Sequence, residues 1–155
     1  MAKKCNCKEL KKSDWDEKEF IWKNKVFYKT KYKEFMHIPL NFGKVITKAF
    51  KEIEKNKIET DGFTLSGEEN VFSSSLMIPL KTKSDKLPTE TMSGSFMTKL
   101  FEGQYKDAGD WAKEMTNYVH GKQKEVAKLW FWYAICPKCA KKMGKVQTVI
   151  FAETK

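Results

Sequence analysis

Arginine is absent from this chain of 155 residues, and all 30 of its basic residues are lysine. Arginine carries the planar fork that recognises phosphate and guanine in a bidentate way, whereas lysine is a hydrated point charge. The formal net charge of +10 therefore indicates a compositional bias more than a surface that reads nucleic acid. The excess of lysine lies in residues 1–34 and 122–155, and we expect nucleic acid not to be the main partner.

The chain also lacks a long hydrophobic run. The longest one ends at Pro137 and falls far short of the roughly 20 residues that a membrane-spanning helix needs. The first seven residues contain no apolar segment of the kind that directs secretion. We therefore expect a cytoplasmic protein without membrane association, folded as a single domain over residues 1–155 with a core that requires no cofactor.

Cysteine is scarce, and its four positions lie near the two ends of the chain. Cys136 and Cys139 have the spacing of a zinc knuckle, and Cys5 and Cys7 would supply two more thiolates if the amino-terminal tail folds back. The lysines around both pairs would offset the negative charge of such a site. The alternatives are a redox pair at 136 and 139, with thiol pKa values lowered by neighbouring lysines, or four unpaired thiols.

The middle of the sequence predicts a strand, a helix and two more strands. Residues 35–40 are typical of a short strand, and the apolar side chains of 43–57 fall on one face of a helix. Strands at 63–65 and 71–80 follow, separated by a polar turn.

The remainder of the chain repeats this order. A strand at 93–101 precedes a helix at 107–121, which Asp107 can cap. An aromatic strand at 129–135 comes next, then a loop at 136–145 and a last strand at 146–152.

Two stretches with the same order of elements, 33–88 and 89–155, imply duplication. We predict an α+β fold in which the duplicated βαββ units form one antiparallel sheet with two helices on one face. The opposite face would then be concave, with a cleft between the two repeats for a small ligand. Ahead of the repeats, residues 1–32 are expected to form a tail and a hairpin that turns at 23–25.

Four consecutive aromatic residues lie in the predicted strand 129–135. Side chains alternate along a strand, so Trp130 and Trp132 share one face while Phe131 and Tyr133 share the other. A small domain has little apolar material to cover two such bulky faces. The pattern therefore indicates either an aromatic-walled pocket or a central strand that is buried on both sides.

Several ordered motifs together resemble the GyrI-like (gyrase-inhibitor-like) family. They are the segment 101–107 leading to Trp111, the Cys-Pro-Lys-Cys-Ala-Lys-Lys block at 136–142, and the segments 20–22 and 38–41. Members of this family are small-molecule-binding domains related to the effector-binding domains of multidrug-responsive transcription activators. The stand-alone subgroup that the chain resembles most is often labelled hydrolase.

The resemblance implies a cleft that binds flat, apolar and often cationic molecules between aromatic walls and a buried acid. Some members hydrolyse reactive compounds with a tyrosine and a glutamate, and the tyrosine of the family's Gly-Pro-Tyr motif is kept here as Tyr105. The family's acidic positions fall near Ser75 and Val149, and neither is acidic. Glu102 and Glu153 are the nearby carboxylates that we nominate in place of the missing acids.

Hydrolysis would need a carboxylate whose pKa is raised by burial, close to a tyrosine hydroxyl. We therefore expect Glu102 to act as general base and Tyr105 as proton donor. The residues expected to bind the ligand are His37, Trp111, Trp130, Trp132, Tyr133 and Glu153.

Three functions remain open from the sequence. The first is a small-molecule-binding domain that senses or sequesters a planar, apolar or cationic aromatic ligand. The second is a hydrolase that uses the same cleft. The third is a zinc-stabilised, lysine-rich accessory protein that docks on nucleic acid or an acidic partner.

Overall fold

The computed structural model describes residues 9–35, 38–135 and 137–155. The chain divides into two compact units, a middle unit formed by Trp22–Gly94 and a terminal unit formed by the residues up to Ile21 together with Ser95–Lys155. The boundaries fall inside two long strands, β1 (Lys18–Phe35) and β5 (Thr89–Gly103). Each unit has one long helix and its own hydrophobic core.

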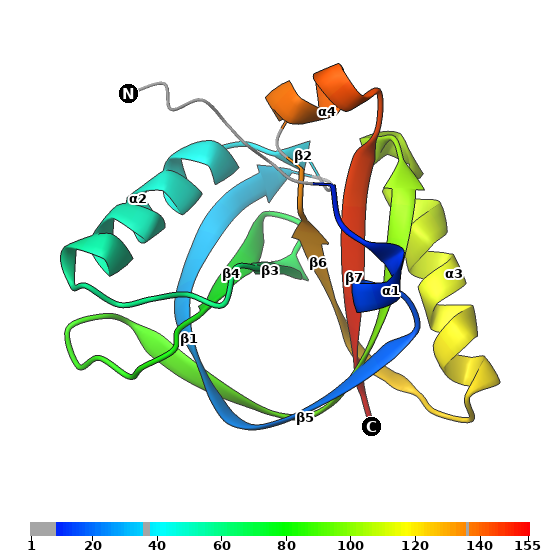
Figure 1. Ribbon diagram of the computed structural model, residues 1–155, viewed down its shortest axis with the longest axis horizontal. Coiled ribbons are helices and arrows are strands. Elements are labelled where there is room, and N and C mark those ends of the chain that lie inside the picture. Colours follow the sequence, from blue (N-terminus) through cyan, green and yellow to red (C-terminus); the bar gives the residue numbers. More distant parts are fainter. Residues whose placement is uncertain (1–8, 36–37, 136) are drawn as a thin grey trace. The chain divides into compact units, whose positions relative to one another are not determined.

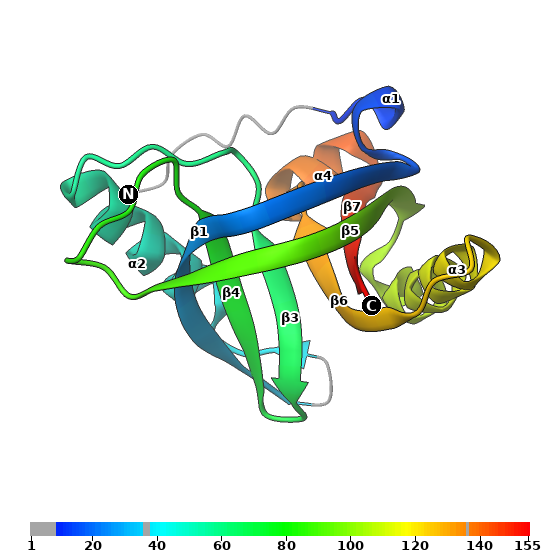
Figure 2. The same ribbon diagram turned by 90° about the horizontal axis from the view of Figure 1, so that it is seen from below.

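The middle unit contains an antiparallel sheet in the order β2-β1-β4-β3. Strand β2 (Ile38–Pro39) pairs with the end of β1, and β4 (Ser73–Pro79) pairs with both β1 and β3 (Leu65–Asn70). Figure 2 shows β3 and β4 as a hairpin. Its turn is closed by the Phe72 N–H, which donates to Asn70 Oδ1 at 2.8 Å.

Helix α2 (Phe42–Lys55) packs on one face of this sheet (Figure 1). Its apolar residues recur every three to four positions, so a single stripe faces the strands and the lysines face outward. Ala49 and Ile53 are fully buried in that stripe. The buried members of the core are Tyr28, Tyr32, Ala49, Ile53, Leu76, Ile78, Leu80 and Leu87.

The terminal unit contains an antiparallel sheet in the order β6-β7-β5. Strand β7 (Val146–Thr154) is central and pairs with β5 on one side and β6 (Val126–Tyr133) on the other. Its residues from Val146 to Ala152 are all buried, so both faces of the strand are covered over this length. The run is apolar apart from the buried polar residues Gln147 and Thr148.

Helix α3 (Ala108–Gly121) lies beside β5 and β7 (Figure 1) and buries Trp111, Met115 and Val119 against them. A 3₁₀ turn, η1 (Tyr105–Asp107), leads into it. Gly103, just before the turn, has φ +152°, and a Cβ there would lie 2.8 Å from Asp107 Oδ2. Only glycine allows this close approach of strand and turn.

The structure confirms the α+β class and the antiparallel pairing, and its helices match the predicted ones at 43–57 and 107–121 to within two residues. The predicted hairpin at 23–25 is wrong, because β1 continues through these residues. A two-residue hairpin turn of type I′ needs positive φ at two successive residues. Of the three, only Asn24 (φ +52°) has it.

The predicted loop at 136–145 is also wrong for most of its length, since residues Pro137–Met143 form helix α4. Proline suits the first position of a helix, where its missing N–H is not needed. Gly144 (φ +76°) ends the helix in a left-handed conformation, and its N–H donates to Ala140 O at 2.8 Å.

One short helix, α1 (Lys12–Trp15), precedes β1 in the terminal unit. In the described part of the chain, no helix is both long enough and apolar enough to span a membrane.

Candidate ligand-binding site

Strand β6 distributes its aromatic side chains as alternation predicts. Phe131 packs against the cluster that contains α3, together with Leu129. Trp130 and Trp132 therefore point to the opposite face of the terminal unit's sheet, and both are almost fully buried. On the neighbouring strand, the same alternation places Phe151 and Glu153 on that side. We call the surface formed by Trp130, Trp132, Phe151 and Glu153 the aromatic face.

Trp15 from α1 covers part of the aromatic face. Its ring centroid lies 4.9 Å from that of Trp132 in an edge-to-face arrangement and 5.9 Å from that of Phe151. Such pairs are favourable because the positive edge of one ring meets the negative face of the other. Two hydrogen bonds fix the position of α1, from Thr98 Oγ1 to Trp15 O at 2.6 Å and from Leu100 N–H to Asp16 Oδ1 at 3.1 Å.

Trp130 lies in a charged environment. Its indole N–H donates to Glu153 Oε1 at 3.4 Å, and the ammonium of Lys128 lies 4.2 Å from the ring centroid. Lys128 and Glu153 are cross-strand neighbours in the pairing of β6 with β7. The structure therefore brings together the predicted residues Trp130, Trp132 and Glu153, and it adds Lys128 and Trp15, which the sequence did not indicate.

Trp111 and Tyr133 lie elsewhere in the terminal unit. Trp111 belongs to the core beneath α3, where it stacks on Phe101 with ring centroids 5.9 Å apart. Tyr133 stacks on Phe131, which is on the α3 side of β6, and its ring also contacts that of Tyr105. These two predicted ligand-binding residues are therefore not part of the aromatic face.

Glu102 does not have the environment expected of a general base. It is exposed, and its Oε2 accepts hydrogen bonds from Lys145 Nζ at 2.7 Å and Gln147 Nε2 at 2.8 Å. The bond from Lys145 and then the bond from Gln147 lower the pKa of Glu102 below its ordinary value. The expectation that burial raises this pKa is therefore wrong, and the carboxylate is stabilised in its charged form.

Tyr105, the predicted proton donor, is engaged with a different partner. Its hydroxyl donates to the backbone oxygen of Ile135 at 3.1 Å, and its side chain is partly exposed. The catalytic roles of Glu102 and Tyr105 stay predictions.

Several predicted site residues lie outside the described residues, namely His37, Cys5, Cys7 and Cys136. Cys139 is described and lies buried in α4. Among the described residues, no group of three or more His, Cys, Asp or Glu side chains is arranged to hold a metal ion. The zinc site stays a prediction.

The middle unit contains buried polar groups that the sequence reasoning missed. Glu34 is 6% exposed, and its carboxylate accepts a hydrogen bond from Ser74 Oγ. Tyr32 lies close by, and burial raises the pKa of its hydroxyl, while hydrogen bonds with Ser66 and Ser74 act in the opposite direction. Alternation along β1 could have revealed that these side chains are buried, because Tyr32 and Glu34 share the face of the core residue Tyr28.

A carboxylate also lies beside Ser75, one of the two positions where the resemblance led us to expect an acid. Ser75 is fully buried, and its Oγ donates to Glu69 Oε1 at 2.5 Å. Glu69 comes from β3, the neighbour of β4. The sequence could not reveal this contact, because it depends on the register of the two strands.

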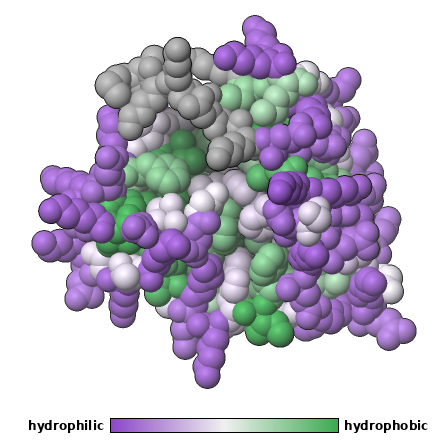
Figure 3. All heavy atoms as spheres, in the orientation of Figure 1, coloured by the Kyte–Doolittle hydropathy of each residue, from purple (hydrophilic) through white to green (hydrophobic). Residues whose placement is uncertain are grey.

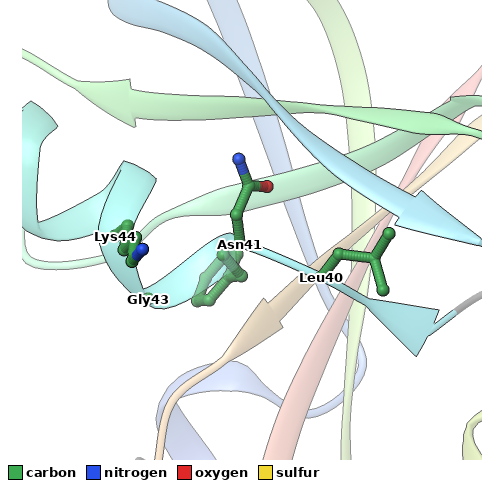
Figure 4. A pocket seen from close by; sticks show the side chains of 5 residues that line it. Leu40, Asn41, Gly43 and Lys44 are labelled. Atoms are coloured by element: carbon green, nitrogen blue, oxygen red, sulfur yellow. The ribbon is translucent and has the colours of Figure 1, made fainter.

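A hollow of about 420 Å3 lies at the start of α2. Leu40, Asn41, Phe42, Gly43 and Lys44 line it (Figure 4), and none of them was predicted as a site residue. Figure 3 shows hydrophilic side chains over most of the visible surface, with hydrophobic ones in separate small patches. Leu40 is 64% exposed, so this hollow is an open surface feature without an enclosed site.

The order of the elements, their antiparallel pairing and the comparisons define a GyrI-like fold, which confirms the predicted resemblance. Residues 1–154 match the family described as "Bacterial hydrolase", and the chain belongs to that family. No curated protein matches the sequence.

Solved structures share this fold. The C-terminal domain of EcmrR has a TM-score of 0.67 and 10% identity, over 91% of this chain and 98% of that one. An uncharacterized conserved protein from Listeria innocua has a TM-score of 0.66 and 9% identity, over 90% and 92% of the two chains. SAV2435, described as bound to tetraphenylphosphonium, has a TM-score of 0.53 and 17% identity, over 90% and 94%. At these identities the likeness shows the fold alone.

Proposed function

We propose that the protein binds a small aromatic molecule, which it senses or sequesters, and that the aromatic face contributes to the binding site. The observation that carries this proposal is the grouping of Trp130, Trp132 and Glu153 on one side of the terminal unit's sheet. Both indole rings are almost fully buried, so they would offer stacking surface to a ligand once the side chains that cover them move aside. Glu153, which accepts the Trp130 N–H, would add a polar group that orients the ligand.

The comparisons support the proposal at the level of the fold. A structure with the same fold is described as bound to tetraphenylphosphonium, a bulky aromatic cation. Flat, apolar and often cationic ligands are the class that the resemblance implies. The cleft between the two repeats, in which such a ligand was expected, stays a prediction.

Trp15 sets a condition on binding. Its edge-to-face contact with Trp132 uses ring surface that a stacked ligand would need. A ligand that stacks on Trp132 must therefore displace the Trp15 ring or pack around it. Either change alters the surroundings of both indoles, so tryptophan fluorescence should report on binding.

A titration of tryptophan variants tests the proposal. We expect wild-type protein to bind at least one member of a panel of polycyclic aromatic dyes at micromolar concentrations in calorimetric titration. Phe replacements at Trp130 and Trp132 should each weaken binding about tenfold. Stacking of an aromatic side chain on a ring the size of a nucleic-acid base contributes roughly 1–3 kcal/mol. Trp111→Phe is the matched control, since it removes an indole from the core beneath α3. Absence of binding across the panel, or equal losses in all three variants, would contradict the proposal.

Hydrolysis is a second candidate function, favoured by the family's description. If Glu102 and Tyr105 carry it, Glu102→Gln and Tyr105→Phe should each abolish turnover of a hydrolysable ligand and leave its binding nearly intact. Because Lys145 holds Glu102 in its charged form, Glu102 would be a weak base until that ion pair opens. Full activity in both variants would show that these roles are assigned wrongly.

A further inference from the structure

A short segment of the terminal unit, residues 9–16, precedes β1 and carries Trp15 onto the aromatic face; we call it the strap. Its helix α1 has only four residues, and no side chain caps its start. None of residues 9–16 is buried, and none belongs to a strand. So short a helix is not stable on its own. Contacts with the rest of the unit therefore hold the strap in place, with α1 beside β7 (Figure 1).

One end of the strap is held by Gln147 of β7. The Gln147 Oε1 atom accepts the Leu10 N–H at 2.6 Å, and its Nε2 donates to Leu10 O at 3.2 Å and to Glu102 Oε2 at 2.8 Å. Gln147 is only 1% exposed, so its amide depends on these protein partners. Water could reach the amide once the strap lifts, so release would leave no buried polar group unpaired. Gln147 is therefore a latch that can open.

The other end of the strap is held by two hydrogen bonds from β5. Thr98 Oγ1 donates to Trp15 O at 2.6 Å, and the Leu100 N–H donates to Asp16 Oδ1 at 3.1 Å. The strap then joins β1 through Glu17, whose φ is +53°. This left-handed conformation is unfavourable for a residue with a side chain. Rotation of the strap about Glu17 would release that strain, which makes Glu17 the natural hinge.

Between the latch and the hinge, the strap places the ring of Trp15 against Trp132 and Phe151. Trp15 is partly exposed, whereas Trp132 is 9% and Phe151 1% exposed. The Trp15 ring therefore shields these two rings from water. The aromatic face thus already holds a fused aromatic ring, and that ring belongs to the chain itself.

We propose that the strap is an intramolecular lid, that Trp15 occupies the place of the ligand, and that a fused, apolar aromatic molecule binds by displacing it. This inference rests on the proposed function, because it concerns the same aromatic face. The indole of Trp15 indicates the ligand class, since a ring that replaces it meets the same apolar surface of Trp132 and Phe151. If the lid is closed about nine-tenths of the time, it lowers the apparent affinity about tenfold, because only the open protein binds.

Calorimetric titration of the full-length protein with acridone, a neutral planar probe, tests the inference by the sign of one effect. Trp15→Ala should raise the affinity about tenfold, because the competing ring is gone. A ligand that packs beside Trp15 would instead lose a wall of its site, and the same variant would bind it more weakly. Tyr118→Ala is the matched control, because it removes a partly buried ring from the α3 side of the same unit. It should leave the affinity unchanged.

Thr98→Val tests the lid with Trp15 in place. It removes the hydroxyl that binds Trp15 O and keeps the shape of the side chain. Loss of one such hydrogen bond should raise the affinity about threefold. Thr116→Val is its control, since it removes a hydroxyl that donates to Ala112 O at 2.9 Å within α3. Circular dichroism would verify the fold of each variant.

Amide hydrogen exchange reports on the strap itself. In the closed protein, the Leu10 N–H is bonded to Gln147 and the Leu100 N–H to Asp16. If the ligand displaces the strap, saturation with acridone should speed the exchange of both amides about tenfold. The amides of β7 should keep their protection, because its pairing with β5 and β6 is not part of the lid.

Three results would overturn the lid and leave the proposed function intact. They are weaker binding of acridone by Trp15→Ala, equal effects of Trp15→Ala and Tyr118→Ala, and unchanged protection of Leu10 at saturation. Binding by Trp15→Ala but not by wild type would support both the lid and the proposed function. Failure of the wild type and of every variant to bind acridone would overturn the inference and count against the proposed function as well.

Discussion

Tyr28 and Glu52 form a hydrogen bond that joins β1 to α2. We expect its removal to change the stability of the protein and the dependence of that stability on pH. The Tyr28 hydroxyl donates to Glu52 Oε2 at 2.7 Å, and Tyr28 is 4% exposed. Burial, and then the hydrogen bond and negative charge of Glu52, raise the pKa of Tyr28 from 10.0 to about 12. The folded state therefore holds the proton more tightly than the unfolded chain does.

The sign of the pH dependence follows from this difference. Because the folded pKa lies above the unfolded value, the stabilisation is complete below pH 10 and is lost as the pH rises from 10 to about 12. At roughly 1.4 kcal/mol per pKa unit, the loss amounts to about 3 kcal/mol. At neutral pH, Tyr28→Phe should lower the free energy of unfolding by about 1.5–3 kcal/mol, the contribution of a hydrogen bond to a charged group.

Urea unfolding followed by circular dichroism, at several pH values between 8 and 12, measures both effects. Lysine side chains also titrate in this range, but they are common to wild type and variant, so the difference between the two proteins isolates Tyr28. We expect the stabilities of wild type and Tyr28→Phe to converge as the pH rises. Glu52→Gln, which keeps an acceptor but removes the charge, should show a shallower dependence. A constant difference between wild type and Tyr28→Phe at all pH values would show that the Tyr28 pKa is not raised in the folded protein.

Three further predictions concern the core, the predicted base and the metal. Met115→Ala should lower the free energy of unfolding by about 2–5 kcal/mol in urea titrations, because the side chain is fully buried beneath α3; a loss below about 1 kcal/mol would contradict that packing. In carboxyl NMR titrations, Glu102 should show a pKa below its ordinary value, and Lys145→Met should bring it back up; an unchanged pKa in the variant would argue against the ion pair. If the four cysteines bind zinc, untagged protein should contain about one zinc ion per chain. A chelator should remove the zinc and lower the stability of the protein. Absence of zinc at every stage of purification would exclude the site.

Local patterns predicted the elements well where a single period decided the structure. The helical stripe of 43–57 and the alternation of Trp130 and Trp132 both reappear, because each depends only on the geometry of its own element. The hairpin predicted at 23–25 is wrong because the structure there does not depend on local sequence alone. Its lysines and asparagine resemble a turn, but the pairing of residues 27–33 with β4 favours a continuous strand over a local turn.

The candidate site was less predictable, because its chemistry depends on contacts between strands. The register that pairs Glu102 with Gln147 brings the Glu102 carboxylate close to an amide donor and to Lys145. These contacts lower the pKa of Glu102, whereas the sequence led us to expect a raised pKa. Register likewise brings Glu69 to Ser75. The contact between Trp15 and Trp132 joins residues far apart in the chain, and no spacing in the sequence indicates it.

The proposed function requires that an aromatic ligand binds at the face formed by Trp130 and Trp132. Indole N–H resonances in 15N-labelled protein, assigned by single Trp→Phe variants and followed during titration with acridone, measure this most directly. We expect the resonances of Trp130 and Trp132 to move and to saturate, while that of Trp111 stays in place. Stationary resonances for Trp130 and Trp132 at saturating ligand, or a shift confined to Trp111, would contradict the claim.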